Sequence, residues 1–167
     1  MALVIVHAPG LSTSNSYVSR AEADAYFEAR PNSDAWTSAA DPEQALIAAT
    51  ARLDLEQFVG YKFLTEARLK WPRFETYDDD GNPYDSATIP QRVKDATCEL
   101  ALHMLNSGTT DSQAATGLEQ FESISLGNIT LTPNQSAPKE GDLPTIVLRI
   151  LRGLIQSSRG NVRLERA

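Results

Sequence analysis

Four segments of the sequence repeat apolar residues at steps of three and four, the spacing that places side chains on one face of an α-helix. Each segment opens with residues that start helices: a Ser19/Glu22 capping box, Asp41-Pro42, Pro90 and Leu143-Pro144. The pattern predicts helices over residues 19–30, 41–58, 90–106 and 143–156. It therefore favours a mainly α fold, a small bundle of about four helices.

The apolar faces of these helices indicate how they should pack. In the second helix the main stripe is Ile47, Ala51, Leu55 and Phe58, with Leu46, Ala49 and Leu53 beside it. The third helix should bury Val93, Ala96, Leu100 and Met104 and expose Arg92, Asp95, Glu99 and His103. The fourth helix carries a double stripe, which suggests burial against two neighbours or against another subunit: Ile146, Ile150 and Leu154 beside Val147, Leu151 and Ile155.

A β-hairpin is predicted over residues 121–132, where two alternating apolar runs flank Gly127-Asn128. Two strands alone are marginal in water, so the hairpin should pair with the Leu3–Val6 run or with a neighbouring subunit. The candidate inter-subunit residues are Ile124, Leu126, Ile129 and Leu131.

The chain divides into three predicted parts. Residues 1–15 form an N-terminal arm, residues 16–156 form the helical domain, and residues 157–167 form a basic, extended C-terminal arm. Within the domain, residues 75–89 read as an acidic loop, since Asp78, Asp79 and Asp80 precede Gly81 and Asn82-Pro83.

Catalytic and cofactor chemistry finds little support in the sequence. Cys98 and His103 are five residues apart on one predicted helix and cannot face each other, so Cys98 is expected in the core. Glu99 and His103 could hold one side of a metal ion, but a solvated pair is the preferred interpretation. No glycine-rich phosphate-binding motif is present. The sequence predicts no enzyme activity, no cofactor and no metal site.

The charge distribution separates an acidic body from a basic end. The formal net charge is −7, yet residues 149–167 hold five arginines and one glutamate. An acidic body disfavours generic binding to phosphate backbones. A single cysteine, with no apolar stretch long enough to span a membrane, predicts a protein made in the cytoplasm with no membrane association.

One stretch nevertheless suits single-stranded nucleic acid. Residues 61–74 interleave four aromatic with four basic side chains: Tyr61, Phe63, Trp71 and Phe74 with Lys62, Arg68, Lys70 and Arg73. The alternative is that Phe63, Leu69 and Trp71 close the core while the basic residues extend outward. This alternative is preferred because the body is acidic.

The chain also resembles one phage family in the order of its motifs, over about residues 16–155. These motifs are Ser16-Tyr17-Val18-Ser19, Ala21 to Phe27, Trp36, Arg52-Leu53-Asp54, Leu69-Lys70-Trp71-Pro72-Arg73, Ile89 to Lys94, Ala96, Glu99-Leu100-Ala101, the 124–131 hairpin and Leu143-Pro144. The sequence is similar to the tailed-phage head–tail connector (adaptor, head completion) proteins, some of which are labelled DnaT-like single-stranded-DNA-binding proteins.

That resemblance implies a structural virion protein in the head–tail neck. Its subunits would form a homo-oligomeric, twelve-fold ring beneath the portal protein and above a tail or tail-completion protein. Genome DNA would pass through the lumen without specific binding. The predicted portal-binding residues are Arg159, Val162, Arg163, Leu164 and Arg166. The alternative function is a single-stranded-DNA-binding accessory protein of replication, which would use residues 61–74.

Overall fold

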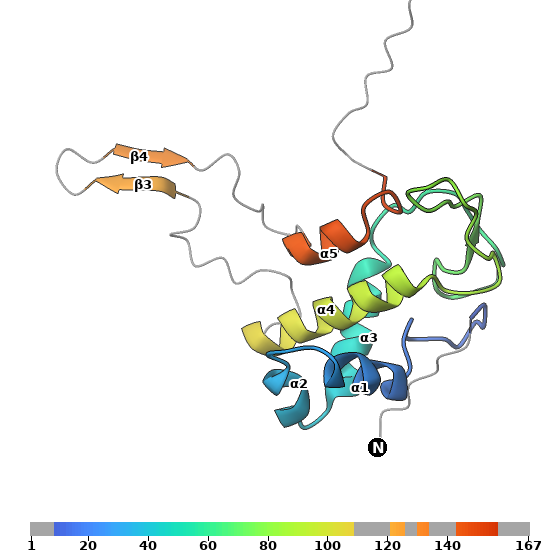
Figure 1. Ribbon diagram of the computed structural model, residues 1–167, viewed down its shortest axis with the longest axis horizontal. Coiled ribbons are helices and arrows are strands. Elements are labelled where there is room, and N and C mark those ends of the chain that lie inside the picture. The colour runs from blue at the N-terminus through green and yellow to red at the C-terminus, as the bar shows by residue number, and fades with distance from the viewer. Residues whose placement is uncertain (1–8, 109–120, 126–129, 134–142, 157–167) are drawn as a thin grey trace, which may run out of the picture.

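The protein is mainly helical, as the sequence predicts (Figure 1). The structure is a computed structural model that describes residues 9–108, 121–125, 130–133 and 143–156. Its helices are α1 (Arg20–Glu28), α2 (Asp34–Ser38), α3 (Pro42–Leu53), α4 (Gln91–Ser107) and α5 (Thr145–Ile150). Its strands are β1 (Tyr61–Lys62), β2 (Arg73–Phe74), β3 (Phe121–Ser125) and β4 (Thr130–Pro133).

Helix α4 is the centre of the helical body, and the other helices pack around it (Figure 1). Pro90 precedes it and Gly108 ends it in the left-handed conformation, with a φ of 65°. The helix buries residues on nearly every side, among them Val93, Ala96, Leu100 and Met104 as predicted. A helix surrounded in this way fixes the positions of α1, α3 and α5.

One residue of α4 lies where the sequence pattern did not place it. Glu99 was expected in solvent but is buried, with 6% of its surface exposed. It accepts hydrogen bonds from Arg30 Nη2 at 2.8 Å and from the Tyr26 hydroxyl at 2.7 Å. The helical period could not reveal this burial because the partners lie about seventy residues away in the chain.

Helix α1 begins as predicted. Ser19 accepts a hydrogen bond from the Glu22 backbone, and the Glu22 side chain accepts one from the Ser19 backbone, so both halves of the capping box are present. Its buried side chains, Ala23 and Phe27, are one helical turn apart.

Helix α3 begins at Pro42 as predicted but ends at Leu53, and only part of its predicted apolar stripe is buried. Leu46, Ala49 and Leu53 are buried, whereas Leu55 is 73% exposed. Phe58, the last residue of the predicted stripe, belongs to extended chain that forms a bridge with Ile155. Its spacing from Leu55 is therefore not helical.

Helices α2 and α5 also depart from the expected pattern. The pattern missed α2, whose five residues are too few to show a period, although its Trp36 is buried. Helix α5 stops at Ile150, and Leu151–Leu154 continue as a turn with Gly153 at a φ of 83°. Its inner side buries Val147 and leaves Ile146 and Leu148 exposed.

Strands β1 and β2 form an antiparallel ribbon that the sequence pattern also missed, since each strand has two residues. Gly60 precedes β1 with a φ of 69°, and a Cβ there would lie 2.3 Å from the carbonyl oxygen of Phe74. Only glycine allows the two chains to approach this closely. The ribbon is anchored to the rest of the body by the Phe58–Ile155 bridge and by a Val59–Leu154 backbone hydrogen bond of 2.9 Å.

The predicted hairpin is present as β3 and β4, which pair antiparallel with Ile124 opposite Leu131. Leu126 and Ile129 lie outside the described residues, as do Leu3–Val6, residues 1–8 and the basic arm at 157–167. Within the described residues β3 and β4 pair with no third strand, and their predicted further partner stays a prediction.

The acidic loop contains no helix or strand after β2, as expected, but it is closed by an ordered turn. The Asp78 carboxylate accepts hydrogen bonds from the backbone of Asp80 at 3.0 Å and of Asn82 at 2.8 Å. The hydrogen bond from the Asn82 side-chain amide lowers the pKa of Asp78 most, and these backbone hydrogen bonds lower it further.

Among the described helices, none has the length and apolar character needed to cross a membrane.

Candidate nucleic-acid interface

The two faces of the β1–β2 ribbon carry different chemistry. Tyr61 pairs with Phe74, and Lys62 pairs with Arg73. Because successive side chains of a strand point to opposite faces, the aromatic pair lies on one face and the basic pair on the other. The mixed composition of residues 61–74 is thus sorted by the ribbon into an aromatic face and a basic face.

The aromatic face is open to solvent. Tyr61 is 60% exposed and Phe74 is 40% exposed, and their rings stack with centroids 5.5 Å apart and planes 29° apart. Phe63 follows two residues after Tyr61 and is also exposed. Exposed aromatic rings are platforms on which unpaired bases stack, whatever the base.

Some aromatic residues of this stretch fit the core-closing interpretation of the sequence, and others fit the nucleic-acid-binding interpretation. Leu69 and Trp71 are buried, as the core-closing interpretation predicts, and Trp71 packs edge-on against Phe58. Phe63 does not close the core, so that part of the prediction is wrong. Three aromatic side chains remain for binding where the composition suggested four.

The basic face lines a hollow of about 470 Å³, which we call the basic hollow. It is formed by two neighbouring stretches and by one residue near the C-terminal end of the described chain, and its lining residues are Gln57, Phe58, Gly60, Lys62, Lys70, Arg73 and Gln156. No carboxylate is among them. A backbone hydrogen bond of 2.7 Å from Gln156 to Gln57 joins the C-terminal end of this rim to the segment after α3.

Arg73 is held rigidly at the edge of the basic hollow. Its guanidinium donates to the backbone oxygens of Val59 at 2.7 Å, Gly60 at 2.5 Å, and Phe58 and Lys70 at 3.3 Å. Burial lowers the pKa of Arg73, although electrostatic interactions with Tyr17 and Asp54 act in the opposite direction. Arg73 thus joins the ribbon to the segment after α3 and leaves a fixed positive charge beside the hollow.

The other basic residues of the stretch are less constrained. Lys62 donates to the backbone oxygen of Ala67, and Lys70 Nζ donates to that of Glu56 at 2.8 Å. Arg68 is exposed. No described carboxylate lies within ion-pair distance of any of these three side chains.

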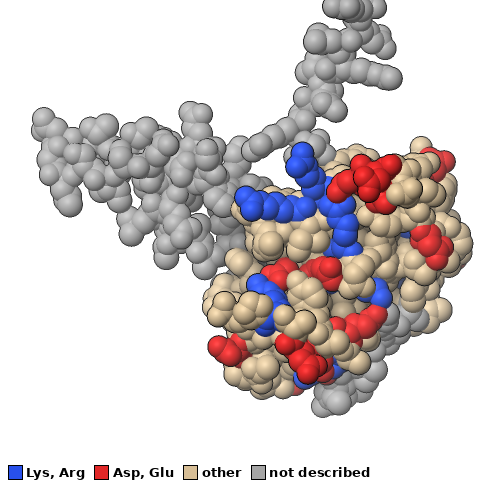
Figure 2. Space-filling view, in the orientation of Figure 1, with Lys and Arg blue, Asp and Glu red and all other residues tan. Residues whose placement is uncertain are grey.

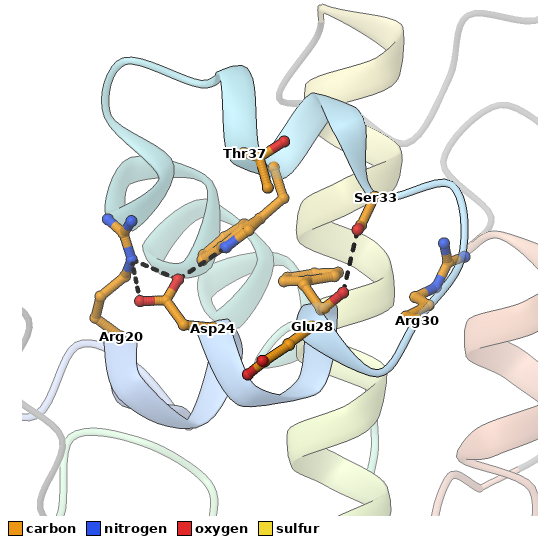
Figure 3. Close-up of a pocket in the computed structure, with 8 residues that line it drawn as sticks. Arg20, Asp24, Glu28, Arg30, Ser33 and Thr37 are labelled. Atoms are coloured by element: carbon orange, nitrogen blue, oxygen red, sulfur yellow. Dashed lines mark hydrogen bonds and ion pairs between the residues drawn. The ribbon is translucent and has the colours of Figure 1, made fainter.

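A second hollow, of about 550 Å³, lies over α1 and α2 and serves as a contrast (Figure 3). Arg20 and Arg30 stand at its two sides, but both are neutralised. Arg20 Nε lies 2.9 Å from Asp24, and Arg30 pairs with Glu99. Asp24 also accepts a hydrogen bond of 2.9 Å from the Trp36 indole. The charges of this hollow therefore hold α1, α2 and α4 together.

The residues considered for catalysis or metal binding stay apart from both hollows. Cys98 is buried in α4, as predicted, and burial, with Asp95, Glu99 and Glu22 nearby, raises the pKa of its thiol from 9.0 to about 12. Glu99 is occupied by Arg30 and Tyr26 and does not form the solvated pair with His103 that the sequence suggested. Among the described residues there is no group of three side chains suited to a metal ion.

Sequence patterns identified the three cations of the basic hollow but not the other residues that shape it. Gln57 and Gln156 are ordinary polar residues in the sequence, and only tertiary contacts bring them together. Gly60 offered a partial signal, since a glycine directly before an aromatic–basic stretch is compatible with a tight strand entry.

A family model described as "Putative DnaT-like ssDNA binding protein" matches residues 1–167, the whole chain. No curated protein and no solved structure matches.

This match corrects the main functional prediction from the sequence. The head–tail connector interpretation, with its ring, portal contact and virion role, is contradicted because the matching family is described by single-stranded DNA binding. The connector interpretation rested on the resemblance in motif order. The acidic body then disfavoured DNA binding by residues 61–74, although a local surface can bind DNA on an acidic protein. The portal contacts assigned to Arg159, Val162, Arg163, Leu164 and Arg166 rested on that interpretation, and these residues lie outside the described ones.

Proposed function

Since the chain belongs to the DnaT-like ssDNA binding protein family, we propose that it binds single-stranded DNA through the aromatic face of the β1–β2 ribbon. The observation that carries this proposal is the exposed, stacked pair of Tyr61 and Phe74. Large aromatic side chains are normally buried, as Trp71 and Phe58 are in this protein. The exposure of Tyr61 and Phe74 therefore calls for another explanation, and a binding role supplies one.

The rings are suited to single strands in particular. The edges and faces of bases in a duplex are already paired and stacked, whereas an unpaired base offers its face to a protein ring. Phe63, the residue that follows β1, is also exposed and would offer its ring to a neighbouring base. The contacts would tolerate any base, because each base has an aromatic face.

The electrostatics predict a modest affinity. Lys and Arg side chains are interspersed with Asp and Glu on the face shown in Figure 2, where they form no broad basic surface. An overall charge of −7 repels phosphate at long range. Attraction must therefore come from the few basic side chains close to the ribbon and should weaken with salt.

The proposal is tested by the binding of a fluorescently labelled fifteen-residue oligothymidine to the full chain, measured by anisotropy. Because stacking contributes about 1–3 kcal/mol per base, replacing both Tyr61 and Phe74 with Ala should weaken binding by about tenfold or more. Leu55→Ala is the matched control, since it also removes an exposed apolar side chain, 73% exposed, but one that belongs to neither strand of the ribbon. Equal affinities for all three proteins would exclude the aromatic face as the binding surface.

A further inference from the structure

We propose that the basic hollow binds a backbone phosphate of single-stranded DNA, with Lys62 and Lys70 as the phosphate-contacting residues. This inference rests on the proposed function and adds the second half of the binding surface. It assigns the phosphate to the basic face of the ribbon and the bases to the aromatic face.

The first support is the lack of compensating carboxylates. In the helical body Arg20, Arg30, Arg52, Arg92 and Lys94 each pair with an Asp or Glu within 4 Å, whereas among the described residues Lys62, Lys70 and Arg73 have no such partner. Three unneutralised positive charges around one hollow attract an anion.

The second support is the number of free donors. An ammonium group has three N–H donors. Lys62 uses one for the Ala67 oxygen and Lys70 uses one for the Glu56 oxygen, so each retains donors for an anion. Phosphate oxygens accept several hydrogen bonds at once and are well matched to two neighbouring ammonium groups.

Arg73 supplies charge without having to move. Its hydrogen bonds to four backbone oxygens fix the guanidinium, and burial removes part of its hydration. A nearby anion would offset that loss of hydration. Asp54 is the opposing charge, but its carboxylate already accepts the Lys70 backbone N–H and the Tyr17 hydroxyl, and it does not line the hollow.

The geometry of the ribbon links this hollow to the aromatic face. The ribbon is two strands wide, with Tyr61 opposite Phe74 and Lys62 opposite Arg73. A DNA strand that passes the edge of the ribbon can therefore stack a base on one face and place a phosphate on the other. The hollow, with a volume of about 470 Å³, is large enough for a phosphate group with its hydration.

The test uses the full chain and compares Lys62→Gln/Lys70→Gln with the wild type in oligothymidine binding across a sodium chloride series. Glutamine keeps a donor for the Ala67 and Glu56 oxygens but removes the charge. Each phosphate contact with single-stranded DNA contributes about 0.7 to the slope of log affinity against log salt. We expect the slope of the double variant to fall by about 0.7 and its affinity at low salt to fall at least about fivefold. The two single variants, each with about half the effect, replace the double variant if it fails to fold by circular dichroism.

Lys94→Gln is the control, because it makes the same change on α4, where Lys94 pairs with Glu22. Its salt slope should match the wild type. An unchanged slope in the hollow variant, together with weaker binding by Tyr61→Ala/Phe74→Ala, would overturn the phosphate site and leave the proposed function standing. Absence of oligothymidine binding by the wild type would overturn both.

A titration with inorganic phosphate separates DNA from a free anion as the ligand. Phosphate should shift the amide resonances of Gly60 and Gln57 only weakly and should compete poorly with oligothymidine. Saturable binding of phosphate in the hollow, without any effect on oligothymidine binding, would overturn the assignment to DNA.

Discussion

The helical body and the β1–β2 ribbon both carry arginine and lysine side chains, but these side chains bind different groups. Around α4 the cations pair with carboxylates: Arg30 with Glu99, Lys94 with Glu22 and Arg92 with Asp79. On the ribbon and in the segment before β2, Lys62, Arg73 and Lys70 bind backbone oxygens, which satisfy hydrogen bonds without cancelling charge. The comparison indicates that charge in the body stabilises the fold, whereas charge on the ribbon is available to a ligand.

The two hollows show the same difference. That over α1 and α2 has arginines on both sides, each neutralised by Asp24 or Glu99 (Figure 3). The basic hollow has three cations and no lining carboxylate. A count of basic residues would not reveal this difference in neutralisation, so the partners of the cations are the informative quantity.

The largest expected effect comes from Gly60→Ala, which changes the residue directly before β1. The new Cβ would lie 2.3 Å from the Phe74 oxygen, and alanine disfavours the φ of 69°. We expect a loss of about 3 kcal/mol in the free energy of unfolding, with loss of oligothymidine binding. Urea denaturation measures the first effect and anisotropy the second.

Gly81→Ala is the matched control for that variant. Gly81 also has a positive φ, 85°, but a Cβ added there would meet no atom within 4 Å. The free energy of unfolding should fall only by the backbone strain of alanine at a positive φ, about 1 kcal/mol, and DNA binding should be retained. Equal losses for the two variants would show that the close approach of the ribbon strands is not what makes Gly60 necessary.

Glu99→Gln should lower the stability of the body without changing DNA binding. The substitution leaves Arg30 and Tyr26 without their anionic partner in a buried setting, and Arg30 remains partly hydrated. We expect a loss of about 2 kcal/mol in the free energy of unfolding and no change in the oligothymidine affinity of the folded protein. Glu28→Gln, an exposed change on α1, should cost less than about 0.5 kcal/mol. Weaker DNA binding by Glu99→Gln would break the division between body and ribbon.

Alkaline pH should destabilise the body. Burial raises the pKa of Cys98 from 9.0 to about 12, and burial with nearby carboxylates also raises the pKa values of Tyr17 and Tyr26. Above about pH 9 the unfolded chain releases protons that the folded chain keeps, so stability is full below that pH and falls as pH rises toward 12. Urea midpoints at pH 8 and pH 10.5 measure this loss. The Cys98→Ala variant should show a smaller difference between the two pH values, and an identical difference would contradict the raised pKa of Cys98.

The smallest expected effect is that of Asp79→Asn. Asp79 pairs with Arg92 at 3.3 Å, but its side chain is 75% exposed. Exposed ion pairs contribute about 0–1 kcal/mol, so the midpoint of thermal unfolding should move by little. A large shift would show that ion pairs at the surface of the body, and not only the buried pair of Glu99, stabilise the fold.

The sequence predicted the fold where the signal was local. The Ser19/Glu22 capping box, Pro42 and Pro90 mark the starts of α1, α3 and α4 correctly, because capping depends on neighbours within one turn. The 121–132 hairpin was also found, from the alternation around Gly127-Asn128.

The errors arose where distant contacts decide the outcome. Glu99 is buried by Arg30 and Tyr26, and the inner face of α3 is chosen by its packing against α4 rather than by its widest apolar stripe. The ribbon strands are too short to show a period of two. Composition identified residues 61–74 as a candidate site, but the separation of Tyr61 and Phe74 from Lys62 and Arg73 depends on strand register, which composition does not contain.

The most direct test of DNA binding by the ribbon is a titration of the ¹⁵N-labelled full chain with unlabelled oligothymidine, followed by amide chemical shifts. Binding at the ribbon predicts the largest shifts at Tyr61, Lys62, Arg73 and Phe74, and little change at Arg20 and Trp36 beside the neutralised hollow. Shifts centred on α5 and the turn after it, where Arg149 and Arg152 are exposed, or no shifts at saturating oligothymidine, would contradict it.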